Sequence, residues 1–369
     1  MIMKQTKICM NAMVGNEEHC IERMLNSCYQ YIDYWVVQCN GNDKTQEIIK
    51  NFFAEKDIPG FTYNHEWDYP GINRDHTLQT ALNADHGCDW ILRMDADEQL
   101  EVLEDFDWDL INNVDPSINS FNVCSKAPGS IYYRTWFWRA GLPWKFNHDR
   151  RHETIYLDGG SINTLDLPPG FNQVLTNDGV TWNDPTKFFA DAVELEKSLV
   201  TSGKILEDNY HFWYLGKSYY DAVNVGSFPL GEDHSQEFAR RCIFYYRNYL
   251  NHRFNYDEVG TAPYIDELGY YALFASANMY RRCGEYEKAI DLAVRAEEFC
   301  PARNEHIVSL AETYRCMEDW GSMKMQTERL VDPERKLPFP TYTFLIHVNF
   351  YIDSGIYGKH LHNIACTNL

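Results

Sequence analysis

The stretch "WILRMDADE" (residues 90–98) is an apolar run that ends in two aspartates separated by one alanine. The run predicts a buried strand, and residues two apart in a strand point to the same face, so we expect Asp95 and Asp97 to point the same way. Two adjacent carboxylates repel each other unless a cation or a proton lies between them. Mg²⁺ or Mn²⁺, completed by substrate phosphates and water, would fill that place; the alternative is an acidic strand end that is simply solvated.

Two other motifs that contain D-x-D do not fit this stretch. A calcium-binding loop needs glycine at its sixth position, where this chain has Leu100. A phosphatase-type aspartyl nucleophile needs a small β-branched residue where Gln99 stands. Binding of a nucleotide sugar through a metal ion needs only an apolar strand, D-x-D and a pocket at the sheet end, so the sequence favours this chemistry.

The residues before this stretch alternate between strand and helix patterns. Strands are expected at 7–13, 34–38 and 90–94, and helices at 45–53, at 73–85 and around Ile21, Met24, Leu25 and Cys28. This alternation predicts an α/β domain with a mostly parallel sheet covered by helices. Ligands of such sheets bind outside the carboxyl ends of the strands, where residues 41–43 and 95–98 both fall.

Composition narrows the class of protein. The chain has 369 residues, of which 44% are hydrophobic, so we expect two domains. A net charge of -21 argues against nonspecific binding to nucleic acid or anionic lipid. We expect no signal peptide and no membrane span, because no apolar run reaches about 18 residues. The 11 cysteines are never spaced as C-x-x-C, which favours reduced thiols in a cytoplasmic protein.

The second half of the chain carries a helical repeat. Three segments share a small residue three positions before a tyrosine: Gly216/Tyr219, Ala277/Tyr280 and Ala311/Tyr314. The last two tyrosines are about 34 residues apart, which is the tetratricopeptide (TPR) period. We therefore expect an all-α TPR-like domain at 183–369 after an α/β domain at 1–182. The repeated residues are packing positions, and such arrays form homodimers or bind protein partners.

Six segments, in their chain order, resemble family-2 glycosyltransferases of the GT-A fold fused to TPR repeats. They are "MNAMVGNEEHCIERMLNSC" (10–28), "DYWVVQCNGNDKTQEIIKNFF" (33–53), "WDYPGINRDHTLQTAL" (67–82), "WILRMDADE" (90–98), "LPWKFNHDRRHE" (142–153) and "WNDPTKFFADAVELEKSL" (182–199). The resemblance implies a metal-dependent, inverting glycosyltransferase. Such an enzyme moves a sugar from a nucleotide-diphosphate donor to a hydroxyl acceptor, which is a glycan, a protein or a small molecule.

The resemblance also implies roles for individual residues. The metal, Mn²⁺ or Mg²⁺, would be held by Asp97, Asp95 and His152. Glu153 is the expected catalytic base, with Asp149 in reserve. The nucleotide sugar would contact Asn16, Glu17, Gln38, Asn40, Asp43, Arg74 and Asp95.

Several of these residues have simpler alternatives. Asn16 and Glu17 would cap and charge a helix start, Asp43 would close a turn, and Arg74 would form a surface salt bridge. The family usually carries a base-binding aspartate where this chain has Gln38, Cys39 and Asn40. This departure leaves the identity of the sugar donor open.

Two rival functions follow from other features. The altered nucleotide loop favours a non-catalytic scaffold, in which a degenerate transferase domain is carried by the repeats. The aromatic and basic stretch 132–153 is compatible with a glycosyltransferase that acts on hydroxylated bases of DNA, because aromatic rings stack on nucleobases. Core packing of Trp136, Trp138 and Trp144 is the simpler explanation of that stretch.

Overall fold

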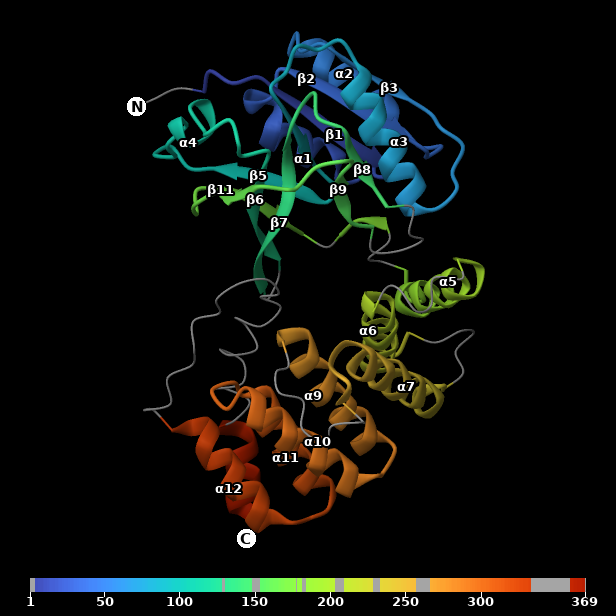
Figure 1. Cartoon of the computed structure of the whole chain (residues 1–369), viewed down its shortest axis with the longest axis vertical. Coiled ribbons are helices and arrows are strands. Elements are labelled where there is room, and N and C mark those ends of the chain that lie inside the picture. The colour runs from blue at the N-terminus through green and yellow to red at the C-terminus, as the bar shows by residue number, and fades with distance from the viewer. Residues whose placement is uncertain are drawn as a thin grey trace. The chain divides into compact units, whose positions relative to one another are not determined.

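The computed structural model describes residues 4–127, 130–147, 153–176, 178–180, 184–202, 209–227, 233–256, 266–332 and 359–368. Its internal contacts divide the chain into two compact units, Met1–Asp184 and Pro185–Leu369. The first unit combines a mostly parallel sheet with helices, and the second is helical (Figure 1). The expected order of an α/β region followed by an all-α region is thus confirmed.

Within the described part of the first unit, nine strands form one sheet. They are β1 (Ile8–Val14), β2 (Tyr34–Cys39), β3 (Gly60–Tyr63), β4 (Trp90–Arg93), β5 (Glu98–Val102), β6 (Ser120–Ala127), β7 (Ser130–Arg139), β10 (Thr164–Asp166) and β11 (Phe171–Leu175). The order is β3-β2-β1-β4-β7-β6-β11-β5, with β10 paired to β6. Strands β3, β2, β1 and β4 are parallel, so their carboxyl ends meet at one edge, whereas β7 runs antiparallel to β4 and β6.

Helices cover both faces of this sheet. The helices are α1 (Ile21–Cys28), η1 (Tyr29–Tyr31, a 3₁₀ turn), α2 (Thr45–Glu55), α3 (Pro70–Asn83) and α4 (Asp109–Asn112). In β1, Met10 packs with α1 and α2 in one core. The preceding residue, Cys9, points to the opposite face of the sheet and packs with α3 in a second core. The small sheet of β8 (Trp144–Phe146) and β9 (Ile155–Leu157) packs on the α3 side.

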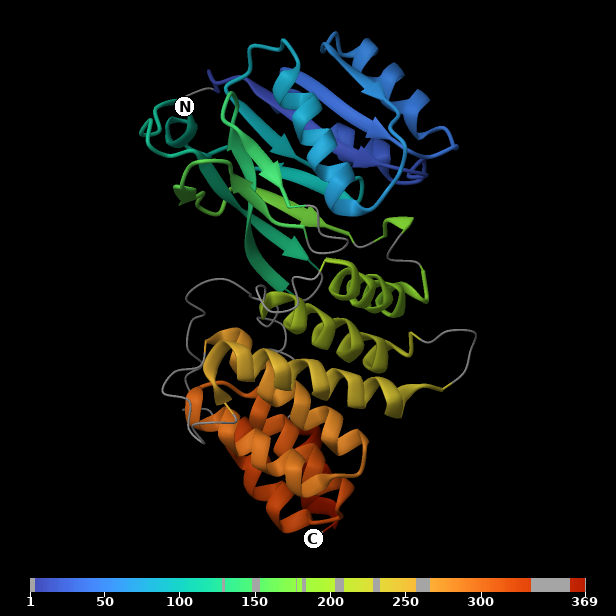
Figure 2. The same ribbon diagram turned by 45° about the vertical axis from the view of Figure 1, so that its right-hand side comes forward.

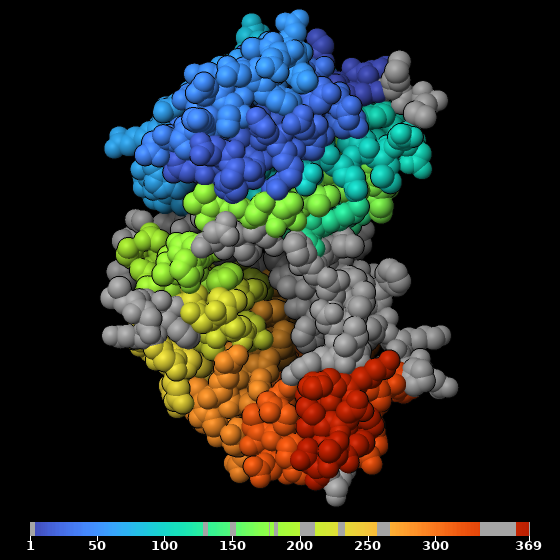
Figure 3. Space-filling model, turned by 180° about the vertical axis from the view of Figure 1, so that it is seen from behind, coloured from blue at the N-terminus to red at the C-terminus, as the bar shows by residue number. Residues whose placement is uncertain are grey.

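The figures show this layering. Helix α3 lies along the sheet in Figures 1 and 2. In the view from behind, blue atoms from the beginning of the chain form the visible outer surface of this unit (Figure 3).

Most predicted elements are confirmed, with changes at their ends. The strands at 7–13, 34–38 and 90–94 and the helix at 45–53 are present, and Ile21, Met24, Leu25 and Cys28 are the buried residues of α1. Helix α3 begins at Pro70 rather than at residue 73, because proline fits the first turn of a helix, where no backbone donor is needed.

The second unit is built from helices that follow one another closely. They are α5 (Lys187–Ser202), α6 (Asn209–Val225), α7 (Ser235–Phe254), α9 (Glu267–Arg282), α10 (Tyr286–Phe299), α11 (Glu305–Cys316) and α12 (Trp320–Val331), and residues 359–368 are also helical. The chain reverses direction between α9 and α10 at Gly284, which has a φ of 76°. Ala277 and Ala311 are fully buried, and a β-carbon at Gly216 would lie 2.6 Å from the Tyr246 ring, so the repeated small residues are packing positions.

Two further expectations concern cysteines and membranes. All 11 cysteines are free, and seven of them are buried. A search of the described residues found no helix that is both long and apolar enough to cross a membrane.

Candidate functional site

Two loops meet at the carboxyl edge of the parallel strands. Residues 15–20 follow β1, and residues 40–44 follow β2. The Asn16 Oδ1 atom accepts a hydrogen bond of 2.9 Å from the Asn42 amide. A β-carbon at Gly41 would lie 2.4 Å from the Asn16 amide nitrogen, so only glycine permits this approach. Asn16 therefore connects the loop after β1 to the loop after β2. The alternative that it caps a helix is wrong, because α1 begins only at Ile21.

Asp43 strengthens the same junction. Its two carboxylate oxygens accept hydrogen bonds of 3.0 Å each from the amides of Glu18 and Thr45. Burial slightly opposes its charge, but the bonds from Thr45 and Glu18 outweigh burial and lower the pKa of Asp43. This geometry is the turn-closing role that the sequence offered as the alternative to base contact.

Gln38 and Asn40, which stand where the related family carries an aspartate, form a buried amide network. The Gln38 side chain is fully buried, donates to Asn40 Oδ1 (2.6 Å) and Asn73 Oδ1 (2.9 Å), and accepts from the Thr77 hydroxyl (2.7 Å). Asn40 also donates to the His65 carbonyl. Because each of these amides already has protein partners, their visible role is to anchor the loop after β2 to α3 and to the residues after β3.

The D-x-D residues lie in a turn rather than in a strand. Strand β4 ends at Arg93 and β5 begins at Glu98. The expectation that Asp95 and Asp97 share a strand face is therefore wrong, and the two carboxylates have different partners. They define two regions of the site, which we call the arginine corner and the acidic corner.

The arginine corner is centred on Asp95. One Asp95 oxygen lies 2.7 Å from Arg74 Nη1, and the other lies 3.3 Å from Arg93 Nη2. Burial alone would raise the pKa of Asp95, but Arg74 and Arg93 outweigh it and hold the pKa well below its ordinary value. Asp95 is thus already neutralised by protein cations, which makes it a poor metal ligand in this arrangement. Arg74 is not a surface residue, since its side chain is 14% exposed.

Glu153, the expected catalytic base, belongs to the same corner. Its carboxylate lies 2.9 Å from Arg74 Nε and 3.8 Å from Arg93 Nη2. Burial raises the pKa of Glu153, but the two arginines more than compensate and lower it. A carboxylate with a low pKa accepts protons poorly, so Glu153 needs a change in its surroundings before it can act as a base.

The sequence interpretation missed two residues of the arginine corner, Arg93 and Arg134, and expected Trp136, which lies between buried and exposed in the structure, to be a core residue. The guanidinium carbons of Arg93 and Arg134 lie 3.9 Å and 3.3 Å from the centre of the Trp136 ring. Both cations therefore lie within cation–π distance of the same indole ring. Arg134 also pairs with the buried Glu98 at 2.7 Å, and burial raises the pKa of Glu98 to about 7 although Arg134 opposes this. Arg93 stands two residues before Asp95, a spacing that suggests an ion pair at a strand end.

The other two tryptophans of the 132–153 stretch are core residues. Trp138 and Trp144 are both fully buried, in the core that also contains α3. Their rings have no exposed face on which a base or a sugar would stack, in agreement with the packing alternative.

The acidic corner contains Asp97 and Glu17. Burial raises the pKa of Asp97, and the negative charge of Asp95 adds to this shift. Burial also raises the pKa of Glu17, to which Asp97 contributes further. Among the described residues, neither carboxylate forms an ion pair with an arginine or a lysine. Both residues offer partly buried carboxylate oxygens, which are donors of the kind that Mn²⁺ or Mg²⁺ accepts.

Residues 178–180 lie against this corner. Arg23 of α1 binds Asp178 at 2.6 Å, and this bond lowers the pKa of Asp178 to about 2. The Val180 amide lies 3.4 Å from both Glu17 oxygens, and a β-carbon at Gly179 would lie 3.1 Å from Asp97 Oδ2. Two expected site residues, Asp149 and His152, lie outside the described residues.

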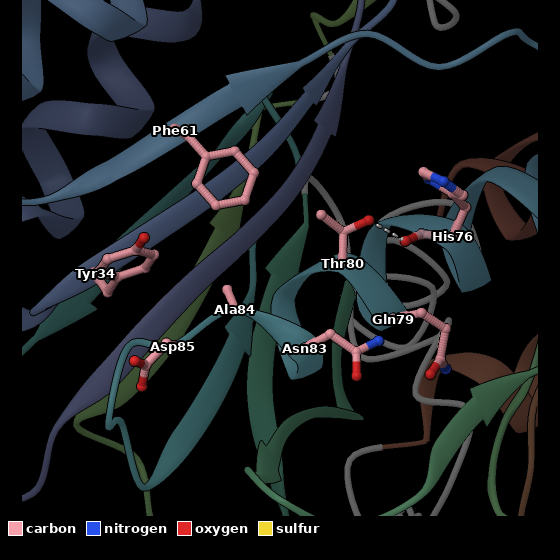
Figure 4. A pocket seen from close by; sticks show the side chains of 8 residues that line it. All are labelled: Tyr34, Phe61, His76, Gln79, Thr80, Asn83, Ala84 and Asp85. Carbon is pink, nitrogen blue, oxygen red and sulfur yellow. Dashed lines mark hydrogen bonds between the residues drawn. The ribbon is translucent and has the colours of Figure 1, made fainter.

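A separate groove runs beside α3. It has a volume of about 540 Å³ and lies between Tyr34 and Phe61 of the sheet and side chains of α3 such as His76 and Asn83 (Figure 4). None of the expected site residues lines it. It is therefore distinct from the two charged corners.

No protein-family model matches this chain, and no curated protein matches it. Fold and site together define an α/β protein with a charged site at the carboxyl edge of its parallel strands, joined to a helical unit. In that site an arginine corner and an acidic corner occupy the ends of the same D-A-D turn.

Proposed function

We propose that this protein is a metal-dependent, inverting glycosyltransferase that transfers a sugar from a nucleoside-diphosphate sugar to a hydroxyl acceptor. One observation carries the proposal: the D-A-D turn separates a cluster of buried arginines from a pair of carboxylates that, among the described residues, pair with no arginine or lysine. Arg74 and Arg93 suit the diphosphate, because guanidinium groups bind its oxygens in a forked geometry. Asp97 and Glu17 suit Mn²⁺ or Mg²⁺.

In the proposed reaction, the acceptor hydroxyl attacks the anomeric carbon while the bond from that carbon to the diphosphate oxygen breaks. A bound metal ion would supply charge neutralisation to the diphosphate. Arg74 would turn from its carboxylates toward the diphosphate. Glu153 then loses its nearest cation, its pKa rises, and its carboxylate takes the proton of the attacking hydroxyl. This coupling would keep the base inactive until a donor is bound.

The test is a screen of nucleoside-diphosphate sugars for Mn²⁺-dependent hydrolysis by the full chain. We expect the native protein to hydrolyse at least one donor and Asp97→Asn to lose the activity by at least about 100-fold. Asp105→Asn is the matched control, because Asp105 is an exposed aspartate outside the site. If no donor is hydrolysed and calorimetry shows no nucleotide binding with Mn²⁺ present, the proposal fails.

One observation favours the scaffold as a second candidate. The amides of Gln38 and Asn40, which replace the family's base-binding aspartate, are committed to the protein interior. A scaffold predicts that no nucleoside diphosphate binds with or without Mn²⁺. A transferase acting on DNA instead predicts retention on DNA at low salt that falls steeply as salt rises.

For the second unit we propose a TPR-like role in binding a protein partner or a second copy of the chain. The support is the succession of paired helices with buried small residues at Gly216, Ala277 and Ala311. Arrays of this kind present extended surfaces to other proteins. Analytical ultracentrifugation of the full chain tests self-association.

A further inference from the structure

The loop that follows β1 brings three different metal-binding side chains together: Glu17, His19 and Cys20. Their donor atoms all lie within 4.8 Å of one another. The Cys20 Sγ atom lies 3.3 Å from Glu17 Oε2, and His19 Nε2 lies 4.0 Å from the same oxygen. The three side chains therefore converge on one oxygen atom.

These distances fit a single bound ion. A point equidistant from three atoms separated by 3.3 Å, 4.0 Å and at most 4.8 Å lies about 2.0–2.4 Å from each of them. Zinc–ligand distances in proteins are about 2.0–2.2 Å to nitrogen and oxygen and about 2.3 Å to sulfur. No large rearrangement of the loop is needed to place an ion among the three donors.

In the absence of an ion, Cys20 and His19 each carry a proton on the atom that would bind it. The Cys20 thiol donates to Glu17 Oε2 at 3.3 Å. The His19 Nε2 atom lies 2.9 Å from the Asp178 carbonyl oxygen, so it donates there as the ring tautomer that carries its proton on Nε2. The 2.9 Å between His19 Nε2 and the Asp178 carbonyl oxygen is also a usual separation between two ligands of one ion, so this oxygen lies close to the proposed ion position.

The neighbouring atoms hold the donors in place. Cys20 is 2% exposed, whereas the His19 side chain is 44% exposed and opens a path from solvent. The Val180 amide faces both oxygens of Glu17 at 3.4 Å. Arg23 fixes Asp178, whose carbonyl meets His19. The site is thus built from two segments, residues 17–20 and residues 178–180.

We propose that Glu17, His19 and Cys20 bind a zinc ion. It is separate from the Mn²⁺ or Mg²⁺ of the proposed transferase, so the Glu17 carboxylate, whose Oε2 atom faces Cys20 and His19, would bridge the two ions. A thiolate and an imidazole are ligands that zinc accepts and that Mg²⁺ and Mn²⁺ do not prefer. On binding, the Cys20 thiol releases one proton to solvent, and the His19 proton moves to Nδ1, so that sulfur, nitrogen and oxygen each give a lone pair to the ion. Water completes the coordination.

The ion would cross-link residues 17–20 within the loop after β1. This loop carries Glu17 and lies against residues 178–180, which also contact Asp97, so zinc would fix one wall of the acidic corner. The site therefore predicts a structural metal rather than a second catalytic one.

The experiment is to load the full chain with Co²⁺ or Zn²⁺ alone, with no nucleotide present. Zinc content after dialysis is measured by mass spectrometry, and the Co²⁺ form is examined for the near-ultraviolet sulfur-to-cobalt charge-transfer band. We expect one ion per native chain and a clear band. Cys20→Ser should abolish the band and weaken zinc affinity by at least about 100-fold.

Two further variants keep the test decisive. His19→Gln changes an exposed side chain, so it should fold normally and still weaken zinc binding. Cys366→Ser is the matched control, because Cys366 Sγ lies 3.6 Å from His362 Nε2 and offers a competing pair of donors. An absent band, or stoichiometric zinc that persists in both Cys20→Ser and His19→Gln, overturns the proposal. Donor hydrolysis is not part of this readout, so failure of the zinc site and failure of the transferase are distinguished.

Discussion

The arginine corner and the acidic corner lie at the same edge of the same sheet, yet they treat carboxylates in opposite ways. Asp95 and Glu153 are partnered by buried arginines, and their pKa values are lowered. Asp97 and Glu17 have no such partner among the described residues, and their pKa values are raised. The two aspartates of one motif, separated by a single alanine, therefore face opposite electrostatic environments.

The presence or absence of a protein cation separates carboxylates that stabilise the fold from carboxylates that are available to a ligand. A carboxylate that the protein already neutralises contributes to stability, and binding a metal there would require displacing an arginine. A carboxylate that is left uncompensated costs stability until a cation binds. The four predictions below test this contrast.

The largest effect is expected for Asp95→Asn. The substitution removes one of the two carboxylates that neutralise Arg74 and Arg93 and leaves only Glu153, and breaking a buried pair costs about 3 kcal/mol. The free energy of unfolding, measured by urea denaturation at pH 7, should fall by this amount. Asp105→Asn is the control and should change it by less than about 0.5 kcal/mol. A cost for Asp95→Asn no larger than that of the control would refute the contrast.

A smaller loss is expected for Trp136→Leu. The guanidinium groups of Arg93 and Arg134 both lie within 3.9 Å of the centre of the indole, and leucine cannot attract either cation. We expect a loss of about 2 kcal/mol in the free energy of unfolding. Trp67→Leu is the matched control, since Trp67 is 51% exposed and should cost little. Equal losses in the two variants would show that the contacts of Trp136 with Arg93 and Arg134 do not contribute to the free energy of unfolding.

The sequence predicted the framework of the sheet but not the charge pattern of its edge. The periodicity of Ile21, Met24, Leu25 and Cys28 is a local signal, because burial of one helix face is written in consecutive turns. The pair of Arg134 and Glu98 joins residues 36 positions apart, and no local pattern reveals it.

Loop contacts were equally hidden from the sequence. The D-x-D pattern suggested that both aspartates lie on one face of a strand. The strand ends at Arg93, however, and the aspartates lie in the turn that follows it. The residues 178–180, which face Glu17 and His19, carried no motif that indicated their place. Their position depends on the antiparallel pairing of β11 with β5, which brings residues 171–175 beside residues 98–102.

The third prediction concerns pH. In the native state the pKa of Asp95 is below its unfolded value of about 3.9, so its stabilising contribution is complete above that value and is lost as the pH falls toward the native pKa. The cost of Asp95→Asn should therefore shrink by about 1 kcal/mol between pH 5 and pH 3. Urea titrations of the native chain and the variant at each pH measure the difference. A cost that grows on acidification would contradict the assigned direction of the shift.

The smallest effect has the opposite sign. The pKa of Asp97 is raised in the native state, so its ionisation destabilises the fold by an amount that grows as the pH rises from the unfolded pKa and is complete above the native pKa. Without metal, Asp97→Asn should therefore raise the free energy of unfolding at pH 7 by about 0.5 kcal/mol. The gain should vanish at pH values low enough to protonate Asp97 in both states. Adding Mn²⁺ should raise the melting temperature of the native chain but not that of the variant, because only the native carboxylate converts its penalty into binding. Since Asp95→Asn and Asp97→Asn make the same chemical change two residues apart, a stabilisation by one and a loss by the other could come only from the different charges around them.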